Sequence, residues 1–219
     1  MTASPRLLAR GSWAPAQVET RWRPDAYEVP PEIDRLADAA VEGLRERGSP
    51  CHDGLAGRLA GYEVSDERLL LQLQPSRWSL RLVEDGASDS LTALCVVRAA
   101  DGRWLAGRRA RWLATWANRW TLGAGGAVEI GESPAETLAR ELEEEWQLVP
   151  EHLSVEALVS LPNRLSMLIG LATVSDAAQP VPDDEHDEFS WWPADVGRWP
   201  QDADERLRRM ATLLAAGVR

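Results

Sequence analysis

Hydrophobic and polar positions follow different patterns before and after about residue 90. Residues 31–47 carry apolar side chains at helical spacing and predict an amphipathic helix, which Gly48-Ser49-Pro50 ends. Residues 55–64 and 68–83 predict strands with a break at Gln74-Pro75, and residues 1–30 show little periodicity and predict an irregular surface arm. The helix has an apolar face made of Ile33, Leu36, Ala37, Ala40, Val41 and Leu44. Together these elements predict a small α+β extension.

From residue 90 onward the pattern is that of a sheet followed by a helix. Strands are predicted over residues 91–99, 103–110, 154–162 and 165–175. A hairpin turn at Asp101-Gly102 joins the first two, and a turn at Pro162-Asn163 separates the last two. A further strand is expected near residues 189–192, after an acidic loop. The chain then predicts a closing helix over residues 204–216, with an apolar face of Leu207, Met210, Leu213 and Leu214.

The segment between these strands combines glycines with a well-marked helix start. Residues 123–126 predict a loop whose backbone can approach a ligand closely, and residues 128–131 predict a short strand. Ser133 fits an N-cap, Pro134 the first helical position and Glu136 the partner in a capping box. We therefore expect a helix from Pro134 to about Leu148. Its apolar stripe is Leu138, Leu142 and Trp146.

Carboxylates gather on another face of the same predicted helix. Glu141, Glu144 and Glu145 follow one another at i, i+3 and i+4, and Arg140 lies beside them, four residues before Glu144. Crowded carboxylates repel one another unless a cation is bound, and hard oxygen ligands favour Mg²⁺ or Mn²⁺. A solvated acidic helix is the alternative. The apolar stripe disfavours that alternative, because it indicates that the helix packs against a core.

The spacing of these residues resembles a known sequence signature. Gly126, Glu132, Arg140-Glu141, Glu144-Glu145 and Leu148 match the fixed positions of the Nudix box, G-x5-E-x7-R-E-U-x-E-E-x-G-U with U aliphatic. Gln147 replaces the last glycine, so either Gln147 adopts a strained conformation or the helix continues further. The resemblance implies an α/β fold, the Nudix α/β/α sandwich with a mixed sheet. It covers about residues 91–216, so we expect a Nudix hydrolase domain over residues 90–219 and the extension over residues 1–89.

The resemblance also implies a reaction and a set of roles. The family hydrolyses nucleoside diphosphates linked to another moiety, using divalent metal. By matching positions, Glu144 and Glu145 are metal ligands, Glu141 is a ligand or the general base, and Glu132 supports the metal shell. Arg140 orients the carboxylates. The carbonyl of Gly125 is a further candidate ligand.

Residues outside the box are candidates for contacts with substrate. Some family members use a carboxylate from a later loop, and a solvated acidic loop is the alternative. Glu185 and Glu188 are preferred among the candidates, which are Asp183, Asp184, Glu185, Asp187 and Glu188. His186 is expected at the surface. The arginines before the box could clamp phosphate: Arg108, Arg109, Arg111 and Arg119. Most of the eleven tryptophans are expected to pack, and one or two to stack on a base or sugar. The substrate-binding set proposed from sequence is Gly126, Arg119, Trp120 and Glu188.

Composition narrows the setting in which such an enzyme works. The net charge of -11 disfavours non-specific binding to nucleic acid. Two cysteines, Cys51 and Cys95, do not fit a disulfide scaffold and favour a reduced, cytoplasmic setting. The first fifteen residues lack the apolar core of a signal peptide, and no apolar run is long enough to span a membrane.

The extension bears on the substrate, a small-molecule nucleoside diphosphate derivative. Residues 31–47, 51–54 and 69–80 are faintly similar to the extension of the UDP-glucose diphosphatase branch, and extensions before the box also occur in ADP-ribose pyrophosphatases, where they help form a homodimer. Both favour a nucleotide sugar of the UDP-sugar or ADP-ribose type. The alternatives are a nucleoside triphosphate pyrophosphohydrolase, a binding or regulatory protein without turnover, and an isopentenyl diphosphate isomerase using Cys95.

Overall fold

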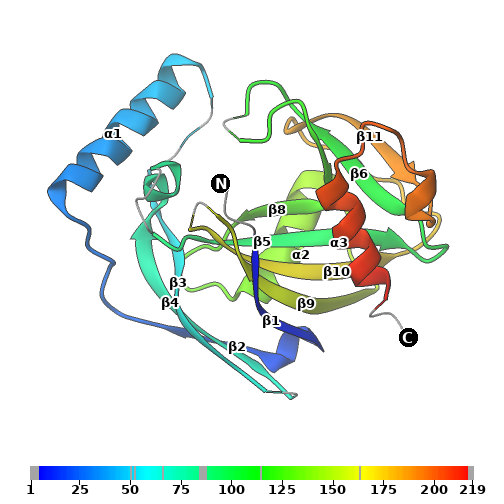
Figure 1. The fold of residues 1–219 in the computed structure, drawn as a ribbon, viewed down its shortest axis with the longest axis horizontal. Coiled ribbons are helices and arrows are strands. Elements are labelled where there is room, and N and C mark those ends of the chain that lie inside the picture. The colour runs from blue at the N-terminus through cyan, green and yellow to red at the C-terminus, as the bar shows by residue number, and fades with distance from the viewer. Residues whose placement is uncertain are drawn as a thin grey trace.

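A mixed sheet forms the centre of the molecule (Figure 1). The computed structural model describes residues 5–49, 51, 53–65, 67–83, 88–113, 115–162 and 164–216. Within them, the main strand order is β1 (Arg6–Trp13), β9 (His152–Ser160), β10 (Ser166–Val174), β5 (Leu91–Ala99), β6 (Trp104–Arg109) and β11 (His186–Trp192). The short strands β7 (Trp120–Leu122) and β8 (Ala124–Ala127) pair with β6 and β5 respectively. β10 and β5 are parallel, and the other recorded pairs of this sheet are antiparallel.

Two helices cover opposite faces of this sheet (Figure 1). Alternate residues of β5 point to the two faces: Ala93 and Cys95 share a core with α2 (Pro134–Trp146), and Val96 shares one with α3 (Glu205–Ala215). The stripe of α2 predicted from the sequence is completely buried. The predicted α/β/α sandwich is therefore confirmed. Short 3-10 helices lie at Pro15–Gln17 (η1), Trp78–Leu82 (η2) and Val196–Arg198 (η3).

A second sheet, in the extension, shares the core beneath α2. It has the order β2 (Val18–Trp22), β4 (Leu69–Arg77) and β3 (Leu55–Val64), with β2 and β4 parallel. Backbone hydrogen bonds tie it to the rest, from Gly57 N to Val128 O at 2.7 Å and from Leu59 N to Asp89 O at 2.9 Å. Val18, Leu59, Leu69, Leu71 and Leu73 belong to the same buried cluster as Leu138 and Leu142.

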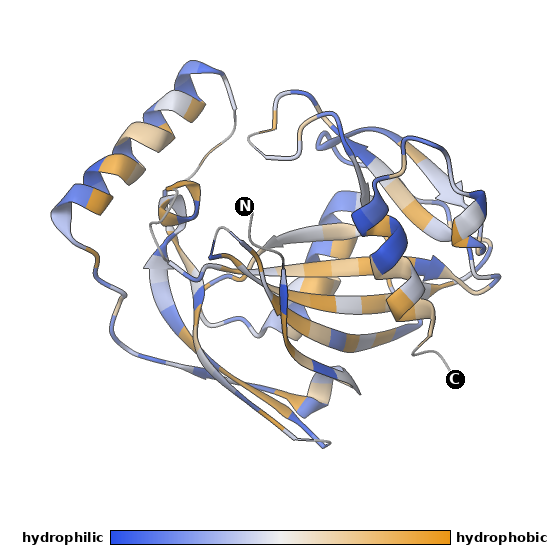
Figure 2. Ribbon diagram, viewed as in Figure 1, coloured by the Kyte–Doolittle hydropathy of each residue, from blue (hydrophilic) through white to orange (hydrophobic). Residues whose placement is uncertain are grey.

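The helix α1 (Pro31–Glu46) lies at the edge of the molecule (Figure 1). Ala37, Val41 and Leu44 are its buried residues, and Ala37 packs in a small cluster with Leu80 and Val83. Figure 2 shows the helix alternating between hydrophilic and hydrophobic positions, whereas the strands of the central sheet are mostly hydrophobic. The predicted helix is confirmed, although Leu36, placed on its apolar face, is 54% exposed.

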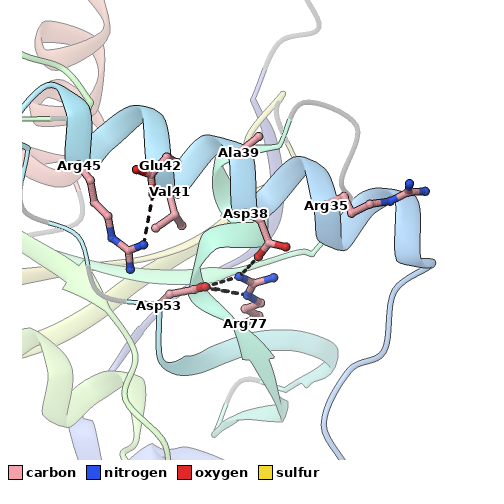
Figure 3. A pocket seen from close by; sticks show the side chains of 8 residues that line it. All are labelled: Arg35, Asp38, Ala39, Val41, Glu42, Arg45, Asp53 and Arg77. Carbon is pink, nitrogen blue, oxygen red and sulfur yellow. Dashed lines mark hydrogen bonds and ion pairs between the residues drawn. The ribbon is translucent and has the colours of Figure 1, made fainter.

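Ion pairs of Arg77, the last residue of β4, connect α1 to the extension sheet (Figure 3). Its guanidinium contacts Asp34 and Asp38 of α1 and also Asp53, with Nε 3.1 Å from Asp53 Oδ1. The surrounding pocket is lined mainly by charged side chains. The ionic cluster therefore supplements a small apolar contact.

Several local predictions were wrong. Residues 6–13 and 18–22 form β1 and β2 instead of an irregular arm, because β9 and β4 supply the backbone partners that a sequence pattern cannot reveal. The strand β4 continues through Gln74-Pro75, because β2 ends opposite Leu73 and no longer pairs with β4 beside Pro75. The missing N–H of Pro75 therefore interrupts no hydrogen bond between β2 and β4. The turn at Pro162-Asn163 lies partly outside the described residues, because Asn163 is not among them.

The segment before α2 also differs from its prediction. Residues 124–127 form β8 against β5, and residues 128–131 form an irregular segment that ends in a turn instead of a strand. In α3 the buried residues are Leu207, Ala211 and Leu214, whereas Leu213 is half exposed. None of the helices in the described part of the chain has the length and apolarity needed to cross a membrane.

Candidate active site

The helix α2 is fixed in place at both ends. Ser133 Oγ accepts a hydrogen bond from Glu136 N, and Glu136 Oε2 accepts one from Ser133 N at 2.8 Å, so the predicted capping box forms. After Trp146 the chain turns at Gln147, whose φ of 53° is left-handed. A non-glycine residue there costs about 1 kcal/mol. Of the two outcomes expected for Gln147, the strained one is the one observed.

The three carboxylates of α2 lie at different depths. The side chain of Glu145 is 6% exposed, that of Glu141 is 12% exposed and that of Glu144 is 58% exposed. Glu145 Oε1 accepts a hydrogen bond of 2.9 Å from Gly125 N on β8. Glu141 lies directly against Gly126, where a methyl group in place of a glycine hydrogen would come within 2.1 Å of Glu141 Oε1. The glycines therefore let the strand approach two buried carboxylates closely.

Arg140 connects the carboxylates on the outer side of the site. Its Nε lies 2.9 Å from Glu132 Oε1, and its Nη1 lies 2.8 Å from Glu141 Oε1 and 2.9 Å from Glu144 Oε2. Thr137 Oγ1 also donates to Glu132, at 2.7 Å. Burial raises the pKa of Glu132, but the hydrogen bonds from Arg140 and Thr137 outweigh it and hold that pKa below its ordinary value. Glu132 is therefore a fixed anion that positions Arg140.

The inner side of the site ends at His186, the first residue of β11. His186 Nε2 lies 3.8 Å from Glu145 Oε2, and neither atom has a hydrogen-bond partner among the described residues. His186 Nδ1 lies 3.3 Å from Asp183 Oδ1. Burial and the charge of Arg109 lower the pKa of His186 to about 4. The surface position expected for His186 is therefore wrong, because β11 begins earlier than its sequence indicates and carries this ring against Trp146.

Burial, together with mutual repulsion, disfavours the ionised forms of the buried carboxylates. Burial raises the pKa of Glu145 well above its ordinary value, and the charges of Glu141 and Glu185 raise it further. Burial also raises the pKa of Glu141, against the opposing charge of Arg140. Each buried carboxylate thus destabilises the other when both are ionised.

The donor set suits a divalent metal, although it is not assembled around one. Hard carboxylate oxygens, mutual repulsion and the orphaned Glu145 Oε2 are the features that a bound Mg²⁺ or Mn²⁺ would satisfy. Across the described ranges, however, the His, Cys, Asp and Glu side chains form no group of three positioned to hold a metal. Arg140 instead contacts Glu141 and Glu144. Metal binding would therefore require Glu141 and Glu144 to give up their contacts with Arg140.

The remaining candidates from the sequence are distributed around this cluster. Glu188 is half exposed and pairs with Arg108 at 2.9 Å, whereas Glu185 pairs with Arg109 at 3.2 Å and its charge reaches both Glu141 and Glu145. Arg119 is exposed and lies over the ring of Trp116, 5.6 Å from its centroid.

Two further side chains lie away from the roles considered for them. Trp120 contacts the Trp192 ring at 5.3 Å and donates to Asp202, so its ring is largely engaged in packing. Cys95 is completely buried and its pKa is raised to about 12 by burial, which removes the basis for a catalytic cysteine.

Arg81 is a residue that the sequence did not single out. It belongs to η2 in the extension, yet its Nη2 donates to Thr92 Oγ1 of β5 at 2.8 Å. No motif or spacing marks it, since its position depends on how the extension packs onto the sheet. Arg109 was considered as one phosphate clamp among four, and the structure distinguishes it by its pairing with Glu185.

Comparison with known proteins identifies the family. The sequence matches the NUDIX domain model over residues 89–214, more than half of the chain, and the chain therefore belongs to the Nudix family. It is accordingly an enzyme, a hydrolase of diphosphate bonds. Nudix hydrolases generally need divalent metal cations. No curated protein matches the sequence.

Several solved structures are similar in fold. A MutT protein from Methanosarcina mazei is 23% identical, with 59% of this chain and 96% of that chain covered and a TM-score of 0.48. The NUDIX domain of Shewanella oneidensis NrtR, complexed with ADP ribose, is 18% identical over 59% and 88%, with a TM-score of 0.46. A C. elegans Ap4A hydrolase is 20% identical over 57% and 93%, with a TM-score of 0.45. The family assignment rests on the sequence match.

Proposed function

We propose that this hydrolase cleaves a nucleoside diphosphate sugar of the UDP-sugar or ADP-ribose type into a nucleoside monophosphate and a sugar phosphate. The single observation that carries the hydrolytic part is the placement of Glu141 and Glu145 against the backbone of Gly125 and Gly126. A close-packed strand next to two repelling carboxylates suits a metal-bound diphosphate, whose charge the carboxylates alone would reject.

The metal is proposed to be Mg²⁺ or Mn²⁺, held by Glu141, Glu144 and Glu145 with the carbonyl of Gly125 as a further ligand. When bound, it polarises the phosphoryl oxygens, activates water and neutralises the leaving phosphate. The hydrogen bond from Gly125 N keeps Glu145 oriented. Glu132 would hold Arg140 beside the site if Glu141 and Glu144 bound the metal instead of Arg140.

A general base completes the proposed reaction. Glu141 serves as a ligand or as the base, and Glu185 is the favoured base from the later loop. Both carboxylates pair with an arginine, but Glu185 is favoured over Glu188 because its charge reaches both buried carboxylates. The base takes a proton from the attacking water, and the cut then depends mainly on positioning and electrostatics.

The sugar-nucleotide part of the proposal rests on features outside the carboxylate cluster. The extension is faintly similar to that of the UDP-glucose diphosphatase branch, and exposed aromatic rings could stack on a base or sugar. Trp116 suits this role better than Trp120, because Trp116 is 43% exposed and lies near Arg119 and Arg206. The proposed substrate contacts are therefore Gly126, Arg119 and Trp116, with smaller contributions from Trp120 and Glu188.

A substrate panel tests this proposal. UDP-glucose, ADP-ribose, dinucleotides, coenzyme A and nucleoside triphosphates would each be incubated with Mg²⁺ or Mn²⁺, and the products identified by mass. We expect the highest kcat/KM for a nucleotide sugar, with a nucleoside monophosphate and a sugar phosphate as products. A clear preference for triphosphates would support the pyrophosphohydrolase alternative, and no turnover on any of them would support a binding protein.

A further inference from the structure

The loop between β10 and β11 is hydrogen-bonded to the C-terminal end of α2. Val181 N donates to Trp146 O at 2.9 Å, and Asp183 N donates to Glu145 O at 3.0 Å. These main-chain bonds hold the start of β11 beside Glu145, the most deeply buried carboxylate of the catalytic helix. The loop therefore has a fixed position relative to α2.

The ring of His186, the first residue of β11, is enclosed by three neighbours. It lies against Trp146, with the ring centroids 4.4 Å apart. Its edge lies against Gly107 of β6, where a methyl group in place of a glycine hydrogen would come within 2.4 Å of His186 Cδ2. On the side of Nδ1, Asp183 Oδ1 is 3.3 Å away. The side chain is 1% exposed, so the surrounding protein sets the orientation of the ring.

Asp183 determines which nitrogen of this ring carries the hydrogen. A carboxylate oxygen only accepts, so its hydrogen bond with His186 places the hydrogen of the neutral ring on Nδ1. Asp183 Oδ1 also accepts a hydrogen bond of 3.0 Å from Glu185 N, which keeps the carboxylate in this orientation. The other ring nitrogen, Nε2, therefore presents a lone pair to Glu145 Oε2.

Two acceptors thus face each other in the interior of the site. His186 Nε2 and Glu145 Oε2 are 3.8 Å apart, both are buried, and neither has a hydrogen-bond partner in the described part of the chain. A hydrogen bond between nitrogen and oxygen requires about 2.7–3.2 Å. A divalent ion lies about 2.0–2.2 Å from each of its nitrogen and oxygen ligands, so one ion can span the observed separation. The geometry therefore fits a cation held between the two atoms.

We propose that His186 Nε2 is a ligand of the metal that Glu145 binds, with Asp183 as the carboxylate that orients the ring. This inference rests on the metal site of the proposed function and is independent of the substrate. No third His, Cys, Asp or Glu side chain among the described residues is positioned to hold the same ion, so backbone carbonyls, water or substrate oxygens complete its ligands. A mixed nitrogen and oxygen donor set favours a transition metal such as Mn²⁺ over Mg²⁺, which takes oxygen ligands.

Pulsed electron paramagnetic resonance of the Mn²⁺-loaded protein tests for this ligand directly, because a bound nitrogen couples to the unpaired electrons of the metal. The chain contains three histidines, His52, His152 and His186. The His52→Gln, His152→Gln double variant, made without a histidine tag, retains His186 alone and alters neither Asp183 nor Glu145. We expect a directly bound nitrogen in this variant, with a coupling that changes when histidine carries the heavy stable isotope of nitrogen.

Substitutions at the site should affect Mn²⁺ and Mg²⁺ differently. His186→Phe keeps a ring beside Trp146 but has no nitrogen, so it should abolish the coupling and weaken Mn²⁺ binding by roughly 100-fold, with a much smaller effect on Mg²⁺ measured by competition. Asp183→Asn, which disturbs only the orientation of the ring, should weaken Mn²⁺ binding by roughly 10-fold. His152→Gln, exposed on β9, is the matched control and should bind both metals like the wild type.

Two results would overturn the proposal while leaving the metal site of α2 in place. One is bound Mn²⁺ that depends on Glu145 but shows no coupling to a histidine nitrogen, which would mean that Glu145 and His186 share a proton instead. The other is equal weakening of Mn²⁺ and Mg²⁺ binding by His186→Phe, which indicates a packing role. If His186→Phe does not fold, the spectrum of the double variant is decisive.

The same measurements separate this inference from the proposed function. They use the metal alone, so a histidine ligand in a protein that prefers another substrate class leaves the inference intact and rejects only the nucleotide sugar. Wild-type protein that binds no Mn²⁺ contradicts both the histidine ligand and the metal site on which it rests.

Discussion

The helices α1 and α2 are both amphipathic and both begin with a proline, but they are stabilised in different ways. Leu138, Leu142 and Trp146 of α2 are completely buried in the main core, whereas α1 contributes Ala37 to a cluster of three buried residues. On their polar faces the comparison is the opposite. Asp34 and Asp38 of α1 are paired with Arg77, while Glu145 of α2 retains a buried oxygen without a hydrogen-bond partner among the described residues.

This difference indicates where the molecule can accommodate chemical function. A helix with a large buried stripe keeps its position even when its polar face contains repelling carboxylates, since each fully buried large apolar side chain contributes about 1.5–3 kcal/mol. A helix with a small apolar contact is displaced more easily, and two aspartates of α1, Asp34 and Asp38, are paired with Arg77. The repelling carboxylates therefore lie on α2, the helix with the larger buried apolar stripe.

The largest effect is expected from altering the polar face of α2. Glu144→Gln should lower kcat by roughly a thousandfold or more while the fold stays intact, because it removes one anionic ligand from a metal whose contribution is several kcal/mol. Turnover with saturating Mg²⁺ on the best panel substrate measures the effect. Glu143→Gln is the control, since Glu143 lies outside the Arg140 network and is exposed. Activity within tenfold of the wild type would remove Glu144 from the metal site.

Removing the extension should be nearly as disruptive, although for a structural reason. Deleting Met1 to Ala87 takes away β1 and the extension sheet and thereby exposes the core beneath α2, including the faces that Leu69, Leu71 and Leu73 cover. We expect the truncated protein to be insoluble, or to change its oligomeric state and substrate affinity. A soluble truncated protein with unchanged mass and kinetics would show that the catalytic domain is independent.

The sequence predicted the α2 region well and the extension poorly, for a physical reason. The helix start, the apolar stripe and the carboxylate spacing of α2 are local features of one segment. The positions of Ser133, Leu138 and Glu141 on the helix could therefore be predicted from that segment alone. The strands β1 and β2 depend on distant partners, and the position of Arg81 depends on how the extension packs. His186 was misplaced for the same reason, because only β6 fixes where β11 begins.

The repulsion within the α2 cluster should be visible in stability. Glu145→Gln is expected to raise the free energy of unfolding without metal at pH 8 by about 1–3 kcal/mol, because it replaces a buried carboxylate whose ionisation burial and neighbouring carboxylates disfavour with a neutral amide. The folded-state pKa of Glu145 is raised above its ordinary value of 4.5, so its ionisation destabilises the wild type as pH rises through the folded pKa. The gain should therefore vanish below pH 4.5. Urea denaturation in EDTA measures it, and a gain independent of pH would contradict this explanation.

The smallest effect concerns the attachment of α1. Arg77→Gln leaves three aspartates without their shared cation and should destabilise the extension locally by about 1–2 kcal/mol, with turnover little changed. Labelling by a maleimide reports this: Cys51, partly exposed after α1, should react roughly tenfold faster, whereas buried Cys95 should stay unlabelled. Arg68→Gln, which breaks an exposed pair with Glu19, is the control. Equal labelling of Cys51 in all three proteins would mean that apolar packing alone holds α1.

The most direct test of the catalytic role of α2 is a Mn²⁺ titration followed by electron paramagnetic resonance. Free Mn²⁺ gives a strong signal that decreases on binding, so the titration counts metal sites without requiring a substrate. We predict saturable binding by the wild type and by Glu143→Gln, and its loss in the Glu141→Gln, Glu145→Gln double variant, with all three proteins folded. Unchanged Mn²⁺ binding by the double variant would contradict the assignment of the active site to this face of α2.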